Sequence, residues 1–175
     1  MRWSKVKQLI EDRMADSLQR RVEVHSTRYY SGQGRGWITV DKREVADMSH
    51  LRAAMESVRI ANEIHMDDTN PETSQLPVRT QWYASRSYNQ VLRRQDSVLS
   101  QYEFHHMLWD SLSLSIEDAL VSDHYLIRAF AMLDSRLGKR RLRTLHLGDD
   151  EHPLVRQFYT LRCEAEGIKA QTIAA

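Results

Sequence analysis

The chain has 175 residues, of which 41% are hydrophobic and 28% charged, a composition typical of a globular domain and too apolar for a disordered chain. Lys and Arg total 25 against 24 for Asp and Glu, so the net charge of +1 gives no global field for non-specific polyanion binding. A single cysteine excludes a disulfide framework, and no apolar run approaches the ~18 residues of a membrane span. We therefore expect a cytoplasmic protein without membrane contact.

The first part of the chain, residues 1–48, predicts a helix followed by a three-stranded antiparallel meander. Apolar residues recur at spacings of three and four over residues 3–18, the pattern of an amphipathic helix. Period-two alternation and β-branched residues then indicate strands at residues 21–30, 37–40 and 44–48. The glycines of residues 31–36 predict a turn before the second strand, and Asp41-Lys42 predicts the tight turn of a hairpin.

The rest of the chain is predicted to be mainly helical, within one domain that spans residues 1–175. We expect a helix and a loop over 49–80, a helical part over 81–168 and a disordered tail over 169–175. The helix of the first of these parts is expected to run to about residue 65, and a second helix is expected over 97–109. Ser115 predicts the cap of a short helix, because Asp118 follows it at the spacing of a capping box.

Two segments of the last third are similar to one another. Residues 123–133 and 151–161 share His, Leu, Arg, Phe and Leu at equivalent positions, and Gly138 and Gly167 follow where left-handed helix caps belong. One interpretation is that any two buried helices share a start signal and an apolar stripe. The other is a degenerate helical hairpin resembling HEAT-type repeats, used as a packing style within one domain. Together these patterns predict an α+β fold whose helical C-terminal part has HEAT-like packing.

Six strings spread over nearly the whole chain carry a family resemblance. They are Trp3 to Lys5, Val22 to Tyr29, Gly34 to Val40, Ser115 to Leu120, Leu133 to Leu142 and Pro153 to Glu166. Together they resemble a family of small bacterial cytosolic proteins with no assigned activity. The resemblance implies a bacterial origin and supplies no catalytic residue. The family has Asp-Gly at the hairpin turn where this chain has Asp41-Lys42, a difference expected to change the turn type.

The histidines do not form a convincing metal site in the sequence. Glu103 and His106 have the spacing of a di-iron bundle motif, but a second such motif is missing, so a partly exposed histidine is the better interpretation. The acidic residues between His146 and His152 do not match a calcium loop. No P-loop or dinucleotide fingerprint occurs, and we expect neither a metal nor a cofactor.

Two patterns suggest nucleic acid. Arg59 and His65 share a predicted helix at a spacing compatible with a metal-independent ribonuclease of the helical-bundle type. A cationic segment, residues 136–143, either complements a helix C-terminus or contacts phosphates. Its cations are Arg136, Lys139, Arg140, Arg141 and Arg143.

None of these patterns rises clearly above a structural explanation, so the leading hypothesis is a non-catalytic binding or interaction protein. Four Trp and seven Tyr offer anchors for a protein partner or for self-association. The ribonuclease and a nucleic-acid-contacting accessory protein are the alternatives.

Overall fold

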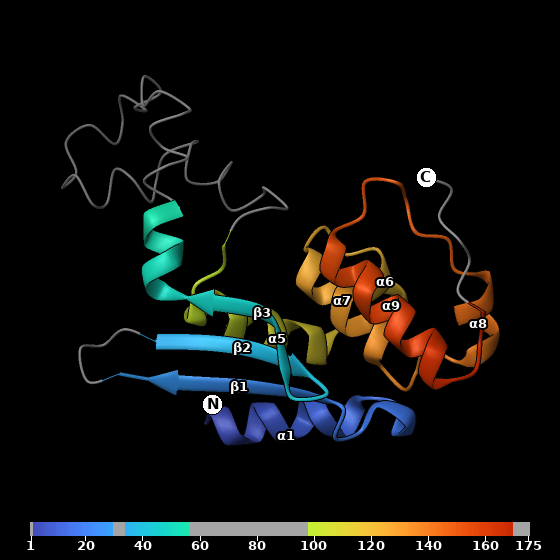
Figure 1. Ribbon diagram of the computed structural model, residues 1–175, viewed down its shortest axis with the longest axis horizontal. Helices are drawn as coiled ribbons and strands as arrows, with labels where there is room; N and C mark the ends of the chain where they lie inside the picture. The colour runs from blue at the N-terminus through green and yellow to red at the C-terminus, as the bar shows by residue number, and fades with distance from the viewer. Residues whose placement is uncertain (1, 30–33, 57–97, 170–175) are drawn as a thin grey trace.

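The computed structural model describes residues 2–29, 34–56 and 98–169 and confirms an α+β fold: an N-terminal helix, a three-stranded antiparallel sheet, then helices (Figure 1). The elements are α1 (Trp3–Arg13), η1 (Asp16–Leu18), β1 (Val22–Arg28), β2 (Gly34–Val40), β3 (Arg43–Ser49), α5 (Gln101–Ser113), α6 (Ile116–Leu120), α7 (Tyr125–Leu133), α8 (Lys139–Thr144) and α9 (Pro153–Ala165). Residues 50–56 are helical as well. The expectations for residues 57–97 and 170–175 lie outside the described residues.

Helix α1 ends five residues before the predicted end at residue 18. Its last turn meets the segment that follows α7, where the N–H of Ala15 donates to the carbonyl of Leu133 at 2.9 Å. The N–H of Ser135 donates to the carbonyl of Arg13, also at 2.9 Å. Backbone hydrogen bonds to a remote segment thus replace those of a further helical turn.

The sheet has the order β1-β2-β3, with Val24 opposite Ile38 and His25 opposite Trp37. The tight turn predicted at Asp41-Lys42 is confirmed, and both residues have positive φ, 48° and 67°. Positive φ at both central residues is what a type I′ hairpin requires, so the expected change of turn type away from Asp-Gly is wrong.

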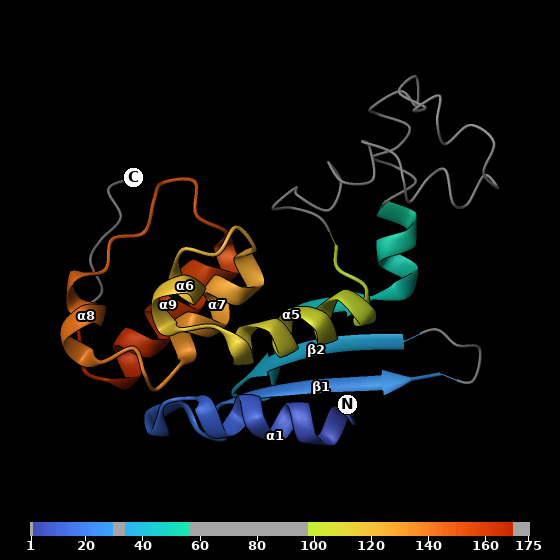
Figure 2. The ribbon, with the colours of Figure 1, turned by 180° about the vertical axis from the view of Figure 1, so that it is seen from behind.

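The predicted turn over residues 31–36 is wrong at its C-terminal end, because Gly34 and Gly36 are part of β2. Helix α5 lies against β2 (Figure 2), and its side chains Gln101 and Phe104 reach these two positions. A methyl group built on Gly36 would overlap Cδ1 of Phe104, and one on Gly34 would overlap Oε1 and Cδ of Gln101. The glycines therefore serve close approach of a helix to the sheet rather than chain reversal.

Helix α5 begins at Gln101 and continues to Ser113, so the helix predicted over 97–109 is displaced. The displacement follows from its cap: Ser100 and Glu103 form a complete capping box. The cap predicted at Ser115 is confirmed, since its hydroxyl accepts the N–H of Asp118 at 3.1 Å.

Helices α7 and α9, which contain the two similar segments, pack against each other. Pro153 occupies the first turn of α9, and Gly167 has the predicted positive φ of 65° after it. The same prediction for Gly138 is wrong, because it has φ −69° and is the N-cap of α8. The relation of α7 and α9 to HEAT-type repeats stays a prediction.

A buried arginine of α9 binds the end of α7 and the segment between α7 and α8. Arg162, 3% exposed, donates to the carbonyls of Leu133, Asp134 and Leu137 at 3.0–3.2 Å. Its Nε donates to Glu166 at 3.0 Å. Each of the three side-chain nitrogens that carry this buried charge therefore has an acceptor.

One continuous cluster of buried apolar residues runs from α1 through the sheet to α5, α7 and α9. Its fully buried large side chains include Leu18, Ile38, Phe104, Leu126, Leu133 and Phe158. No helix in the described part of the chain has the length and apolar character needed to cross a membrane.

Candidate functional site

A cleft of about 450 Å³ lies at the end of the sheet, where β1 finishes and α5 begins. The pairing of Arg28 with Gly34, and of Arg35 with Ser49, brings the ends of all three strands together there. The cleft is lined by Trp3, Ser26, Thr27, Arg28, His50, Gln101, Tyr102 and His105. Its volume falls within the ~300–1,000 Å³ typical of small-ligand sites. We call it the sheet-end cleft.

The capping box of α5 positions one side of the sheet-end cleft. The N–H of Glu103 donates to Oγ of Ser100 at 3.2 Å, and the N–H of Ser100 donates to Oε2 of Glu103 at 2.7 Å. Because this box fixes where α5 starts, the first turns of the helix present Gln101, Tyr102 and His105 to the cleft.

A hydrogen-bonded wall joins α5 to β1. Nε2 of Gln101 donates to Oγ of Ser26 and to the carbonyl of Thr27, both at 2.7 Å. Nε2 of His105 lies 2.9 Å from the same Ser26 hydroxyl. On its other side, His105 stacks on Trp3, with ring centroids 4.5 Å apart and planes at 17°. The wall is held from three elements, so its polar groups are organised before any ligand arrives.

The sheet-end cleft combines unused hydrogen-bonding capacity with neutral histidine. Burial lowers the pKa of His105, and the charge of neighbouring His106 lowers it further, so the imidazole is neutral at pH 7. Nδ1 of His50 is buried and has no hydrogen-bond partner. An unsatisfied buried polar group costs about 1–3 kcal/mol, and such groups are concentrated at functional sites.

The pairing of Ser26 with His105 has the spacing of a nucleophile and its base. A catalytic pair of this kind also needs a third group that orients the imidazole. Within the described residues, no acidic side chain hydrogen-bonds His105.

A second cluster lies at the N-termini of α7 and α9 and explains why their sequences are similar. Nδ1 of His124 accepts the N–H of Leu126 at 3.2 Å, and Nδ1 of His152 accepts the N–H of Leu154 at 3.1 Å. The ring of Tyr125 stacks on that of His152, with centroids 3.8 Å apart. The shared histidine is thus a helix cap in both segments.

An ion pair ties the two caps together. The guanidinium of Arg128 and the carboxylate of Glu151 are 2.7 Å apart, and both side chains are 12% exposed. The partnership lowers the pKa of Glu151 against the opposing effect of burial, and burial with the charge of Glu103 raises the pKa of Tyr125 to about 12. The two caps, the ring contact and the ion pair all serve the packing of α7 against α9, so we assign the cluster a structural role.

The predicted nuclease pair, Arg59 and His65, lies outside the described residues. Glu103 and His106 share α5 but have different partners, since Glu103 serves the capping box and the ring of His106 contacts that of Tyr102 at a tilt of 54°. Across residues 2–29, 34–56 and 98–169, no three potential metal ligands converge.

The cationic segment, residues 136–143, is largely paired with acids. Arg136 bonds Asp134 and Lys139 bonds Glu166, at 2.7 and 2.8 Å, and Arg141 pairs with Glu117. Arg140 and Arg143 are exposed. Lys139 and Arg140 lie at the start of α8, whereas Arg141 and Arg143 lie in its last turn, where cations complement a helix C-terminus. Phosphate contact by this segment stays a prediction.

Sequence reasoning did not find the sheet-end cleft. Trp3 and Ser26 lie in strings that carried the family resemblance, whereas Gln101 and His105 lie outside those strings. No local motif joins these residues, because the hydrogen bonds that connect them span more than seventy positions. The only usable signal was the pair of strand glycines, which mark where a helix approaches β2.

A comparison with protein families finds one family whose model matches most of the chain. The model of the SF0329 protein family matches residues 2–163, a span that includes every residue of the sheet-end cleft. No curated protein matches the chain, and no solved structure matches it.

Proposed function

The chain belongs to the SF0329 protein family, and we propose that it is a non-catalytic binding protein whose ligand occupies the sheet-end cleft. The observation that carries the proposal is the wall formed by Ser26, Gln101 and His105, which is hydrogen-bonded within itself and stacked on Trp3. Rigid polar groups beside aromatic rings are the usual composition of a small-ligand site.

The composition of the cleft supports binding over catalysis. Its aromatic groups offer flat surfaces, and the hydroxyl of Ser26 and the amide of Gln101 fix directions for hydrogen bonds. The Ser26–His105 pair has no carboxylate partner among the described residues, which is the feature that separates it from an activated nucleophile. A ligand that enters is therefore held and released unchanged.

The test is a fragment screen on the full chain, followed by two-dimensional ¹H–¹⁵N NMR. The library contains matched anionic, neutral and cationic ring compounds, and the proposal expects some of them to shift the amides of residues 26–28 and 101–105. A library in which no compound shifts these amides contradicts the proposal.

Two aromatic residues of α5 supply a matched pair of variants. Tyr102 lines the cleft and is 64% exposed, whereas Trp109 is 43% exposed on the same helix and lies outside the cleft. Tyr102→Ala should weaken any cleft ligand, while Trp109→Ala should leave its affinity unchanged. Equal effects of the two substitutions would place the ligand elsewhere.

We propose the following setting for this function. The resemblance to bacterial proteins and the single cysteine support a bacterial cytosol. The equivalent caps of α7 and α9 support a distant kinship with HEAT-type repeats. Exposed Val121 and Trp109 support a protein partner or self-association, which gel filtration with light scattering would detect.

A further inference from the structure

The arginines around the sheet-end cleft differ in whether they have an acidic partner. Arg28 lines the cleft, is exposed, and has no acidic partner among the described residues. By contrast Arg21 pairs with Asp41 at 2.8 Å, and Arg35 pairs with Asp47 at 2.7 Å. The arginine beside the cleft is thus available for an external anion.

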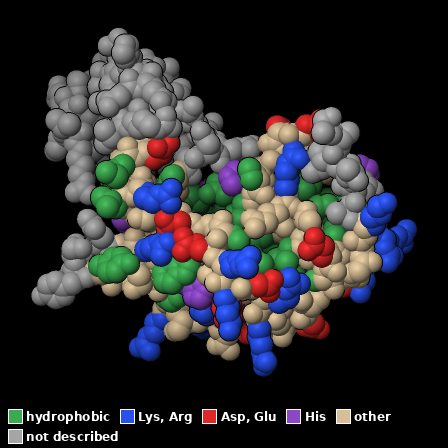
Figure 3. Space-filling model, viewed as in Figure 1, with side chains coloured by type: hydrophobic (Ala, Val, Ile, Leu, Met, Phe, Trp, Pro, Cys, Tyr) green, Lys and Arg blue, Asp and Glu red, His purple; other side chains and the backbone are tan. Residues whose placement is uncertain are grey.

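The acids nearest the cleft are already committed. Glu103 is bound in the capping box, and Asp47 is held by Arg35 and by Arg52 at 2.7 and 2.8 Å. Those two arginines also lower the pKa of Asp47 against its burial, so the carboxylate stays ionised and paired. Paired cations and anions alternate over the side of the sheet seen in Figure 3. No Asp or Glu is among the described lining residues of the cleft.

The side chain in the cleft that is not already paired also favours an acceptor. Arg28 carries only donors, whereas both amide hydrogens of Gln101 are used by Ser26 and by the carbonyl of Thr27. A carboxylate or a phosphate is acceptor-only when ionised, so it matches this lining, whereas an ammonium group would meet Arg28 with like charge.

We propose that the ligand of the sheet-end cleft is an aromatic or other flat molecule carrying a carboxylate or phosphate group, which Arg28 binds. This inference rests on the proposed function and narrows its ligand class. Trp3 and Tyr102 provide the surface for the flat part, and the guanidinium of Arg28 provides a planar pair of donors for the anion.

The test uses four probes that share one ring: benzoate, phenyl phosphate, benzamide and benzamidine. Each is titrated into the full chain and followed by the amide signals of residues 26–28 and 101–105. The proposal expects benzoate or phenyl phosphate to bind more tightly than neutral benzamide and cationic benzamidine, and the stronger of the two identifies the anion.

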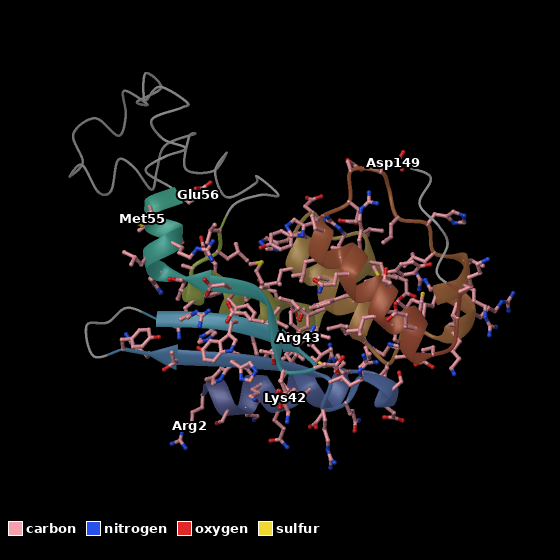
Figure 4. The ribbon with its side chains drawn as sticks, viewed as in Figure 1. Arg2, Lys42, Arg43, Met55, Glu56 and Asp149 are labelled. Atoms are coloured by element: carbon pink, nitrogen blue, oxygen red, sulfur yellow. The ribbon has the colours of Figure 1, made fainter. Side chains whose placement is uncertain are left out.

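Two arginine variants locate the charge. Arg28→Gln should weaken the anion by about fivefold, the upper end of what an exposed charge pair contributes. Arg43→Gln is the control, because Arg43 is an exposed strand residue at the hairpin, which Figure 4 places at the opposite end of the sheet from the cleft. The affinity of the Arg43→Gln variant for the anion should stay within about twofold of the wild type. Added salt should weaken anion binding by the wild type and by Arg43→Gln, but not by Arg28→Gln.

The outcomes separate this inference from the proposed function. Equal binding of benzoate and benzamide, or preference for benzamidine, overturns the anionic ligand while a binding cleft remains. Equal losses in Arg28→Gln and Arg43→Gln overturn it as well. If none of the four probes shifts the cleft amides, the inference fails, and the wider fragment screen then decides on the proposed function by itself.

Discussion

The contact between Gly36 and Phe104 gives the sharpest stability prediction. A methyl group on Gly36 would overlap Cδ1 of Phe104 and stand 2.9 Å from Cε1 and 3.2 Å from Cγ of the same ring, against about 3.5–4.0 Å for ordinary carbon contacts. Phe104 is fully buried, so its ring has no solvent to move into. Overpacking costs about 1–3 kcal/mol, and replacing glycine in a strand returns about 0.5–1 kcal/mol. We expect Gly36→Ala to lower the free energy of unfolding by about 1.5 kcal/mol.

Urea denaturation followed by tryptophan fluorescence measures this change. Gly138→Ala is the control, because nothing lies within 4 Å of a methyl group there, and its effect should stay within about 0.5 kcal/mol. Phe104→Leu makes room for the methyl group, so Gly36→Ala should cost at least about 1 kcal/mol less in that background. Full stability of Gly36→Ala, or strict additivity of the two changes, would refute the packing argument.

Two further predictions concern the helical part. Arg162→Met removes a donor from three buried carbonyls. Those of Leu133 and Asp134 keep a backbone N–H donor, but the carbonyl of Leu137 is left without one, so the free energy of unfolding should fall by about 1–3 kcal/mol. Exposed Arg140→Met should change it by less than about 0.5 kcal/mol, and urea titrations that give equal values contradict the network. The pKa of His124 in the folded state is lowered, mainly by burial and then by the charge of Arg128. The neutral imidazole that caps α7 therefore contributes its full stability above the unfolded pKa of 6.5. Stability of about 1 kcal/mol should disappear as pH falls from 6.5 through that lower pKa. His124→Asn keeps a cap that does not titrate and should flatten thermal stability between pH 6.5 and 5, and an unchanged slope would rule the cap out as its source.

The elements of this fold were predictable wherever local signals agree with the tertiary structure. The period-two strings formed β1 and β3, and Asp41-Lys42 formed the hairpin turn between β2 and β3. Ser115 capped α6 because its partner Asp118 is only three positions away. Signals contained within one turn of helix or one hairpin need no knowledge of the rest of the chain.

The predictions that were wrong share one cause, which is contact with a segment that is remote in the sequence. Helix α1 stops early because Leu133 and Ser135 take its backbone groups. Gly34 and Gly36, which have turn composition, are strand residues because α5 lies on them. Tertiary contacts of this kind override local propensity, and one sequence does not encode them as a local pattern.

The candidate site was beyond sequence reasoning for the same reason. The ring of Trp3 in α1 stacks on that of His105 in α5, and the side chain of Gln101 donates to Ser26. In both pairs the two residues are far apart in the sequence. The histidines that the sequence analysis considered have structural roles: His152 caps a helix, and the ring of His106 packs at a tilt against that of Tyr102. A buried histidine atom without a partner, at His50, is visible only in three dimensions.

The most direct test of a ligand-binding cleft follows the histidine side chains themselves. Two-dimensional ¹H–¹³C spectra of the full chain resolve imidazole Cε1–Hε1 signals, which single His→Gln variants assign, during titration with benzoate or the best fragment. His50 and His105 line the cleft, so their signals should shift and saturate at the same ligand concentration. The signals of His124 and His146, which lie outside the cleft, should stay fixed as internal controls. Saturable shifts confined to His124 or His146, with His50 and His105 unmoved, would contradict the account.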